Sequence, residues 1–256
     1  MGDRSILKEF FDDDIPRYAI LSHTWGPNEP TFQDFAVPGF RDAHVKIDGC
    51  CDRALKDNYE YVWIDNICID KSSSAELSEA INSMFAWYAG SGVCYAYLSD
   101  TSFDHKTPMD ELADPDSDFC RSRWFTRGWT LQELIAPERV EFYNSSWDYI
   151  GVKTITVDTW KGRGHETFHE LLEKITGIPY RVLTGRESLS SVSVAARMTW
   201  AASRRTTRKE DVAYCLLGIF GINMSMLYGE GDRAFARLQE EIIRTSDDES
   251  IFMPVS

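Results

Sequence analysis

The sequence predicts an α/β protein with a mostly parallel sheet flanked by helices, followed by a largely helical C-terminal extension. Apolar runs rich in β-branched and aromatic residues are typical of strands, and they occur at 18–22, 61–64, 93–98 and 140–143. Runs that are apolar on both faces favour a parallel sheet, and helical periods follow several of them. We expect residues 1–150 to form the α/β domain and residues 151–256 to pack on it as a mainly helical extension.

The stretch from Tyr61 to Leu98 predicts a strand–loop–helix–strand unit. The run from Tyr61 to Ile64, continuing through Asp70, is expected to be a buried, central strand. A serine cluster at 72–74 then interrupts the apolar pattern. A helix should begin near Ala75, with an apolar stripe formed by Leu77, Ile81, Met84 and Tyr88, and a second strand should follow at 93–98.

The remaining elements follow from the same patterns. A first strand at 18–22 ends in a Gly-Pro turn, and a helix at about 42–57 would bury Val45, Ile47, Cys51 and Leu55. Residues 100–118 are acidic and are expected to form an exposed loop. Thr130 and Thr207 each precede a glutamate by three residues, which predicts helix caps at both, with the second helix running to about Leu217. No clear pattern covers 147–190, and further helices are expected at 192–203 and about 232–244.

Composition excludes several classes of function. The chain has 256 residues and a formal charge of −14, which argues against nucleic acid or an anionic membrane as the main partner. No apolar run approaches the ~20 residues of a membrane span. The six cysteines lack C-x-x-C spacing, and with five scattered histidines they predict no metal site. Cys68 and Cys94 are most simply small core residues in a reducing, cytoplasmic compartment.

Acidic side chains gather where the 61–70 strand should end and the next helix should begin. Asp65 and Asp70 lie at the carboxyl end of the strand, and Glu76 and Glu79 open the helix. Ligands usually bind at that edge of an open parallel sheet. A structural alternative stays open, because Ser73 and Glu76 also form a capping box and Glu79 also suits a solvated helix face.

Three blocks of the sequence together resemble a known family. They are Tyr18-Ala-Ile-Leu-Ser-His-Thr-Trp-Gly26, Trp63-Ile-Asp-Asn-Ile-Cys-Ile-Asp70 followed by Glu76, and Arg127-Gly-Trp-Thr-Leu-Gln-Glu133. In this order and spacing they resemble the signature blocks of the fungal heterokaryon-incompatibility (HET) domain over residues 17–145. The segment from about 196 to 231 resembles the region after this domain in incompatibility proteins with a central NACHT module and WD repeats. The sequence departs from the commoner family pattern at Asp70-Lys71, Leu77 and Ala80.

The resemblance implies a fold and a role. HET domains are regarded as distant relatives of the Toll/interleukin-receptor (TIR) fold, a flavodoxin-like sheet, and they trigger programmed cell death in fungal innate immunity. Several TIR domains hydrolyse NAD with a glutamate at the corresponding helix start, which implies Glu76, with Glu79 as its neighbour. The full-length protein implied by the resemblance is an NLR-like receptor. Self-association on activation and downstream NACHT and WD-repeat regions are the implied partners. NAD would be a substrate, and no permanently bound cofactor is expected.

The chemistry of an NAD glycohydrolase suits the residues at this edge. Cleaving a bond to a pyridinium requires stabilisation of an oxocarbenium-like centre, contacts to ribose hydroxyls and a dry pocket, and an aromatic ring can stack on the nicotinamide. The residues expected to contact the ligand are Ser22, His23, Trp25, Gly26, Asp65, Asn66, Cys68 and Asp70. The structural alternatives place Trp25 in the core, His23 in a turn and Asp65 on backbone N–H groups. A non-enzymatic signalling module that acts through protein–protein contacts is the alternative function.

Overall fold

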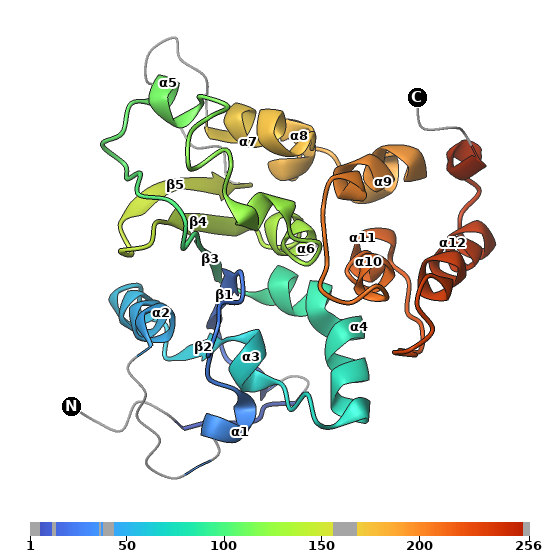
Figure 1. Cartoon of the computed structure of the whole chain (residues 1–256), viewed down its shortest axis with the longest axis horizontal. Coiled ribbons are helices and arrows are strands. Elements are labelled where there is room, and N and C mark those ends of the chain that lie inside the picture. The colour runs from blue at the N-terminus through green and yellow to red at the C-terminus, as the bar shows by residue number, and fades with distance from the viewer. Residues whose placement is uncertain (1–5, 12–13, 36, 38–43, 156–167, 253–256) are drawn as a thin grey trace.

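The sheet has five strands in the order β2-β1-β3-β4-β5 (Figure 1). The computed structural model describes residues 6–11, 14–35, 37, 44–155 and 168–252. The strands are β1 (Tyr18–His23), β2 (Tyr61–Trp63), β3 (Val93–Tyr97), β4 (Arg139–Tyr143) and β5 (Tyr149–Thr154). All neighbouring pairs are parallel except β4 with β5, which is antiparallel. The predicted α/β class with a mostly parallel sheet is therefore confirmed, and the strand order is that of flavodoxin-like sheets.

Helices cover both faces of the sheet because successive strand residues point to opposite sides. Ile20, Cys94 and Phe142 belong to a large apolar cluster with α4 and the later helices, whereas Leu21 and Tyr95 belong to a smaller cluster with α2. Figure 1 shows α2 on one side and α4, α6 and the C-terminal helices on the other. The helices are α1 (Phe32–Phe35), α2 (Val45–Lys56), α3 (Asp65–Cys68), α4 (Ser74–Gly90), α5 (Met109–Leu112), α6 (Thr130–Ile135), α7 (Phe168–Thr176), α8 (Tyr180–Leu183), α9 (Val194–Ala202), α10 (Asp211–Tyr214), α11 (Leu217–Phe220) and α12 (Arg233–Thr245), with 3-10 turns at Arg123–Thr126, Leu189–Ser191 and Glu249–Phe252.

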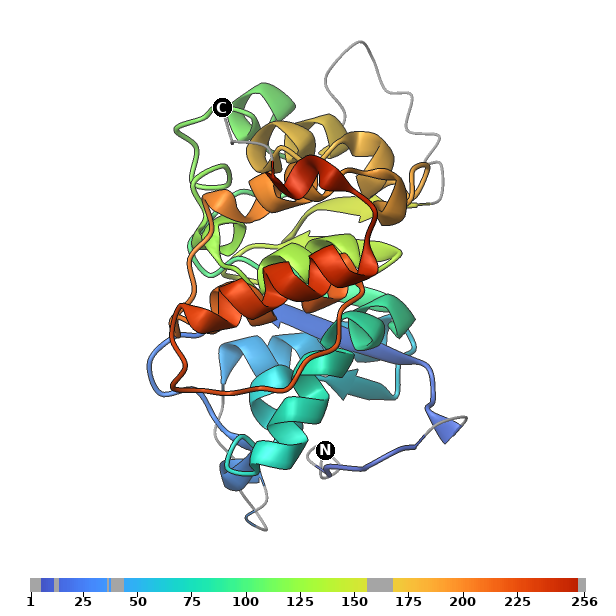
Figure 2. The ribbon, with the colours of Figure 1, turned by 90° about the vertical axis from the view of Figure 1, so that its right-hand side faces the viewer.

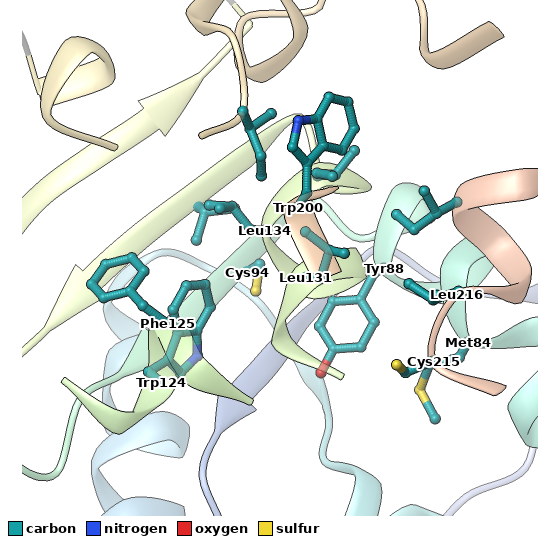
Figure 3. Packing of buried hydrophobic residues seen from close by; sticks show 14 of the residues in the cluster. Met84, Tyr88, Cys94, Trp124, Phe125, Leu131, Leu134, Trp200, Cys215 and Leu216 are labelled. Atoms are coloured by element: carbon teal, nitrogen blue, oxygen red, sulfur yellow. The ribbon is translucent and has the colours of Figure 1, made fainter. Parts of the chain in front are cut away.

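The C-terminal helices share one core with the sheet. The large cluster runs without interruption from Cys94 on β3 through Leu131 and Leu134 on α6 to Leu216 and Trp200 (Figure 3). Figure 2 shows α12 as the outermost helix on this side, where its apolar stripe of Ala234, Leu238 and Ile242 is buried. The helical character of the C-terminal region is thus confirmed. The division into two domains at residue 150 stays a prediction, and β5 crosses that position.

Helix α4 is fastened to the C-terminal region at two points. The Asn82 amide donates to the Met224 carbonyl and accepts the Met224 N–H, both at 3.2 Å. On the next turn, Phe85 fills the space that a Cβ on Gly218 would need, so α11 approaches α4 closely only because residue 218 is glycine. These contacts join the helix that begins near Glu76 to residues 218–224.

The strand expected over 61–70 is wrong in both length and position. β2 is a three-residue, half-buried edge strand, and Asp65–Cys68 forms the helical turn α3. Ile64 and Ile67 are both buried against the α2 side of the sheet, and their spacing of three suits a helical turn. The run is apolar because this turn is buried, not because the strand is central.

Three details of the helices also differ from expectation. On α2, Ile47 is buried as predicted, but Val45 and Leu55 are more than half exposed. The Trp147 ring occupies the space beside Gly49, which turns a different face of α2 inward. The expected Thr130 and Thr207 caps are wrong: the residues at the helix starts are Trp129 and Glu210, neither with a side-chain cap bond, and the second helix is the two short turns α10 and α11.

Candidate functional site at the carboxyl edge of the sheet

The candidate site lies where β1 and β2 end. The chain goes from β1 outward to β2 and then returns across β1 to β3, so β1 flanks the point where the strand order reverses. Carboxyl ends of parallel strands meet at one edge, and this reversal is the usual ligand position in open α/β sheets. His23 ends β1, and Asp65 begins α3 directly after β2.

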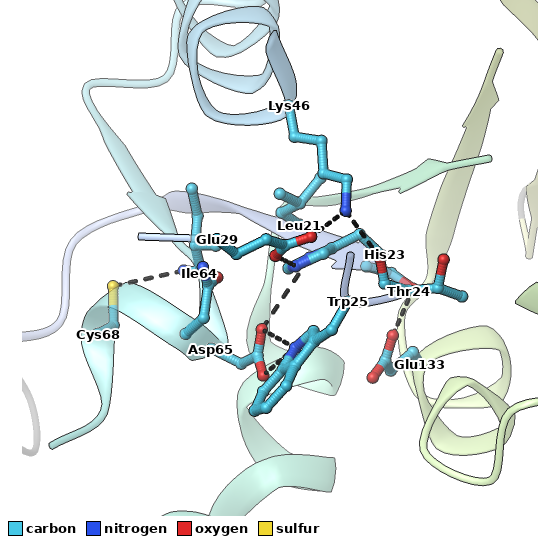
Figure 4. A network of polar contacts seen from close by, with 12 residues as sticks. Leu21, His23, Thr24, Trp25, Glu29, Lys46, Ile64, Asp65, Cys68 and Glu133 are labelled. Atoms are coloured by element: carbon cyan, nitrogen blue, oxygen red, sulfur yellow. Dashed lines mark hydrogen bonds and ion pairs between the residues drawn. The ribbon is translucent and has the colours of Figure 1, made fainter. Parts of the chain in front are cut away.

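His23 lies between two carboxylates at this edge (Figure 4). Its Nε2 is 2.9 Å from Glu29 Oε2, and its Nδ1 is 4.0 Å from Asp65 Oδ1. Lys46 of α2 forms an ion pair with Glu29 and donates to the Thr24 carbonyl at 2.7 Å. We call His23, Trp25, Glu29, Lys46, Asp65 and Lys71 the edge network.

Glu29 is the ionised centre of the edge network. Burial alone would raise the pKa of Glu29, but contacts from His23 and Lys46 and the Gly26 N–H outweigh burial and lower the pKa to about 2. The Gly26 N–H donates to Glu29 Oε1 at 2.6 Å. The predicted residues His23 and Gly26 therefore meet here, around a carboxylate that the sequence analysis did not name.

Trp25 presents a half-exposed ring above this network. Its Nε1 donates to Asp65 Oδ2 at 3.0 Å, and 52% of the residue is exposed. The ammonium of Lys71 lies 3.6 Å from the centre of the indole ring and 3.3 Å from Asp65 Oδ2. Asp65 thus holds an aromatic edge and a cation together, and Trp25 is not the core residue of the structural alternative.

Asn66 and Cys68 support the loops around the site. The Asn66 amide donates to the Pro30 carbonyl at 2.6 Å, which ties α3 to the loop after β1, while its Oδ1 is buried without a hydrogen bond to any described residue. The Ile64 N–H lies 3.4 Å from Cys68 Sγ. Burial raises the pKa of the Cys68 thiol to about 11, so this group is a neutral thiol near pH 7.

Asp70 and Glu76 form a second polar group at the start of α4. Glu76 Oε1 accepts the Asp70 N–H at 2.7 Å, and Ser73 Oγ accepts the Glu76 N–H at 3.3 Å. The predicted Ser73 cap is confirmed, and the Glu76 carboxylate closes the loop that precedes it. Glu76 and Glu79 are both exposed. Lys71 directly follows Asp70 and connects this group to the edge network.

Ser22 lies beneath the surface, away from these exposed groups. Its hydroxyl donates to Glu133 and accepts a hydrogen bond from Trp124 Nε1 at 2.8 Å. We call Ser22, Tyr88, Trp124 and Glu133 the buried network. Burial raises the pKa of Glu133 to about 8, although the Ser22 hydrogen bond opposes the shift. Glu133 is therefore a neutral acid near pH 7, and Ser22 supports the end of β1 from within.

The structure thus divides the predicted site residues into three groups. His23, Trp25 and Asp65 meet in the edge network, Asp70 and Glu76 meet at the α4 start, and Ser22 joins the buried network. The residues that sequence reasoning missed are the distant charge partners Glu29, Lys46 and Lys71 and the carboxyl of Glu133. Lys46 carried no sequence signal, because the apolar pattern of α2 indicated another face, and its burial is seen only in the structure.

A cavity of about 220 Å³ lies elsewhere, between α6, β5 and α8. Lys153 lines it, donating to the Ile135 carbonyl at 3.4 Å and to that of Pro137. Burial lowers the pKa of Lys153 to about 8. Its ammonium satisfies carbonyls at the end of α6, which is a structural use of a buried lysine.

Two further observations cover the described part of the chain. Within it, no cluster of three or more His, Cys, Asp or Glu side chains is arranged to hold a metal ion. None of its helices combines the length and apolar character needed to cross a membrane.

Comparison with known proteins connects this edge to a family. Residues 18–118 match the family model described as heterokaryon incompatibility protein (HET). The chain is 42% identical over 251 residues to vegetative incompatibility protein HET-E-1 of Podospora anserina. That match covers 94% of this chain but 17% of the relative's length. No solved structure matches the chain.

Proposed function

The chain carries a heterokaryon incompatibility (HET) domain, and from this premise we propose that it is the cell-death effector part of a fungal non-self recognition protein. The similarity to a vegetative incompatibility protein supports this role. The chain spans about a sixth of that relative's length. We propose that it belongs to a longer receptor with NACHT and WD-repeat regions. We further propose that this receptor is cytoplasmic and is activated by self-association.

The proposed reaction is hydrolysis of NAD(P) at the nicotinamide–ribose bond. Water attacks the ribose carbon, nicotinamide leaves with the bonding electrons, and ADP-ribose (or its phosphorylated form), nicotinamide and a proton are the products. Nicotinamide leaves as a neutral molecule, so no acid is required on the leaving group. The observation that carries the proposal is the half-exposed Trp25 ring held by Asp65 at the strand-order reversal, since it offers a stacking surface beside a carboxylate.

Each exposed group has a role in this scheme. Glu76 supplies negative charge to the oxocarbenium-like centre, and Asp70 accepts from a ribose hydroxyl. Trp25 stacks on the nicotinamide, and Asp65 adds negative potential near the pyridinium. Ser22, Asn66 and Cys68 act in support, because their side chains hold strand and loop ends.

A non-enzymatic assembly module remains the second candidate, and one contact favours it. Glu76 already accepts the Asp70 N–H, a structural task that fully explains a glutamate at this position. In that case the exposed groups at this edge would contact partner proteins, and cell death would follow from assembly alone.

The substitution Glu76→Gln separates the two candidates. Glutamine keeps an acceptor for the Asp70 N–H, so the free energy of unfolding should change by less than ~1 kcal/mol. If Glu76 stabilises the reacting ribose, loss of its charge should lower the rate of NAD cleavage by a factor on the order of 10²–10³. NAD consumption by artificially clustered protein and cell killing should be measured for both proteins.

Glu79→Gln is the matched control, because Glu79 is exposed one turn further along α4 and should have a milder effect. If the Glu76→Gln protein kills cells as efficiently as the parent and has the same melting temperature, the glycohydrolase proposal fails and the assembly module is favoured.

A further inference from the structure

One face of the half-exposed Trp25 ring already holds a cation. The Lys71 ammonium lies 3.6 Å from the centre of the indole ring, well within the ~6 Å range of a cation–π contact. Moving the Lys71 side chain away from the ring also breaks an ion pair, because Asp65 Oδ2 lies 3.3 Å from the same ammonium. Burial lowers the pKa of Lys71, and the nearby Asp65 opposes that shift.

These three side chains have the composition of a site for an organic cation. An electron-rich ring face, a carboxylate at its edge and partial exposure to solvent are the features that recognise quaternary or aromatic cations. Here Asp65 fixes the indole by accepting from its Nε1 at 3.0 Å, so the ring is held in place for stacking. The protein's own lysine occupies the ring face.

We propose that Trp25 and Asp65 form a binding site for a planar aromatic cation of the pyridinium class, and that Lys71 blocks it as an internal competitor. The identification of that cation as oxidised nicotinamide rests on the proposed function. A pyridinium ring and the Lys71 ammonium cannot occupy the same indole face together. A ligand that stacks on this face beside Asp65 must therefore displace Lys71, which weakens its binding in the resting protein.

The test measures binding of the 1-methylnicotinamide cation, with neutral nicotinamide as the comparison ligand. Lys71→Ala should bind the cation roughly three- to thirtyfold more tightly than the parent, since it removes a competing cation–π and ion-pair contact. Lys71→Arg keeps a cation at the ring and should bind as weakly as the parent. Trp25→Leu in the Lys71→Ala background should abolish the gain.

Two controls keep the outcome interpretable. Lys209→Ala removes an exposed lysine from the turn before α10 and should leave binding unchanged. In the unmodified protein, the Lys71 ε-methylene proton signals should be shifted upfield by the ring and should return toward ordinary values as the cation is added. Equal affinity of the parent and Lys71→Ala proteins, or an unmoved Lys71 signal at saturation, would overturn the proposal.

The result is separable from the proposed reaction. If Lys71→Ala binds the cation more tightly but clustered protein does not cleave NAD, the binding site is supported and the glycohydrolase proposal fails. If NAD is cleaved but the parent and Lys71→Ala bind the cation equally, the reaction is supported and Lys71 has no blocking role.

Discussion

Two glutamates on either side of the end of β1 have opposite ionisation. Glu29 in the edge network has a pKa lowered to about 2, whereas Glu133 in the buried network has a pKa raised to about 8. Burial pushes both values upward. The difference comes from the partners, since Glu29 contacts an ammonium, an imidazole and a backbone N–H. Glu133 is hydrogen-bonded to the neutral hydroxyls of Ser22 and Tyr88, and the charges of Asp65 and Arg204 shift its pKa in opposite directions.

The comparison shows that the same residue type serves two tasks within one strand end. The edge network is held together by charge and is partly open to water. The buried network is held by hydrogen bonds between neutral groups and is closed. The first suits recognition of a charged ligand, and the second fixes the strand that carries the recognising residues.

Removing the Glu133 side chain should have the largest effect on stability. Glu133→Ala opens a cavity next to Ser22 and Tyr88 and takes away the acceptor of Ser22, so the free energy of unfolding should fall by about 3 kcal/mol. Glu133→Gln retains shape and a carbonyl oxygen for Ser22 and should cost less than about 1 kcal/mol. Urea denaturation at pH 6 measures both, and equal losses would mean that Glu133 is ionised in the folded state.

The pH dependence of stability should follow Glu133 next. Its folded pKa of about 8 exceeds the ordinary value of 4.5, so the folded state keeps a proton that the unfolded chain releases. This contribution is fully present below about pH 4.5 and is lost as the pH rises toward 8. We expect the free energy of unfolding to fall by about 2 kcal/mol between pH 5 and 8. This is less than the limit of about 1.4 kcal/mol per pH unit, because local rearrangement lets water reach the ionised carboxylate.

Glu133→Gln supplies the comparison for this pH series, since it has no proton to lose in that window. The parent should be the more stable protein at pH 5, and its advantage in the free energy of unfolding over Glu133→Gln should shrink as the pH rises and reverse by about pH 8. Parallel curves from pH 5 to 8 would show that other groups cause the decline.

Glu29 should produce a smaller effect of the opposite sign. Its lowered pKa means that its stabilising contribution is present above about pH 4.5 and is lost as the pH falls toward 2. Glu29→Gln should remove about 1 kcal/mol of this acid-induced loss. The effect is modest because burial of the Glu29 carboxylate offsets much of the stabilisation from its contacts with His23 and Lys46. Glu240→Gln, on the exposed face of α12, is the control and should leave the acid limb unchanged.

Local pattern predicted most of the fold but not the arrangement of its strands. β1, β3, β4, α4 and α12 were found because their periodicity is long enough to be distinctive. The position of β2 at the edge was missed, because strand order depends on pairing between distant residues and a three-residue strand carries little signal. The buried face of α2 was misjudged for a similar reason, since Trp147 packs against Gly49 from about a hundred residues away.

The candidate site was predicted in part for the same physical reason. Residues at strand ends can be located once the strands are known, and His23, Trp25 and Asp65 do meet. Their charge partners cannot be located in this way. Lys46 reaches Glu29 from a helix whose apolar pattern indicated another face, and Glu133 reaches Ser22 across 111 positions of sequence. Glu76 was correctly placed at a cap, and its chemical role stays a prediction.

The fastening of α4 to residues 218–224 has a mechanical consequence. A helix is stiff along its axis, and α4 is gripped at Asn82 and Phe85 while its first turn carries Glu76. We therefore expect a tilt of α11 to displace the first turn of α4, which carries Glu76. The packing thus offers a direct physical connection from the C-terminal helices to the carboxyl edge of the sheet.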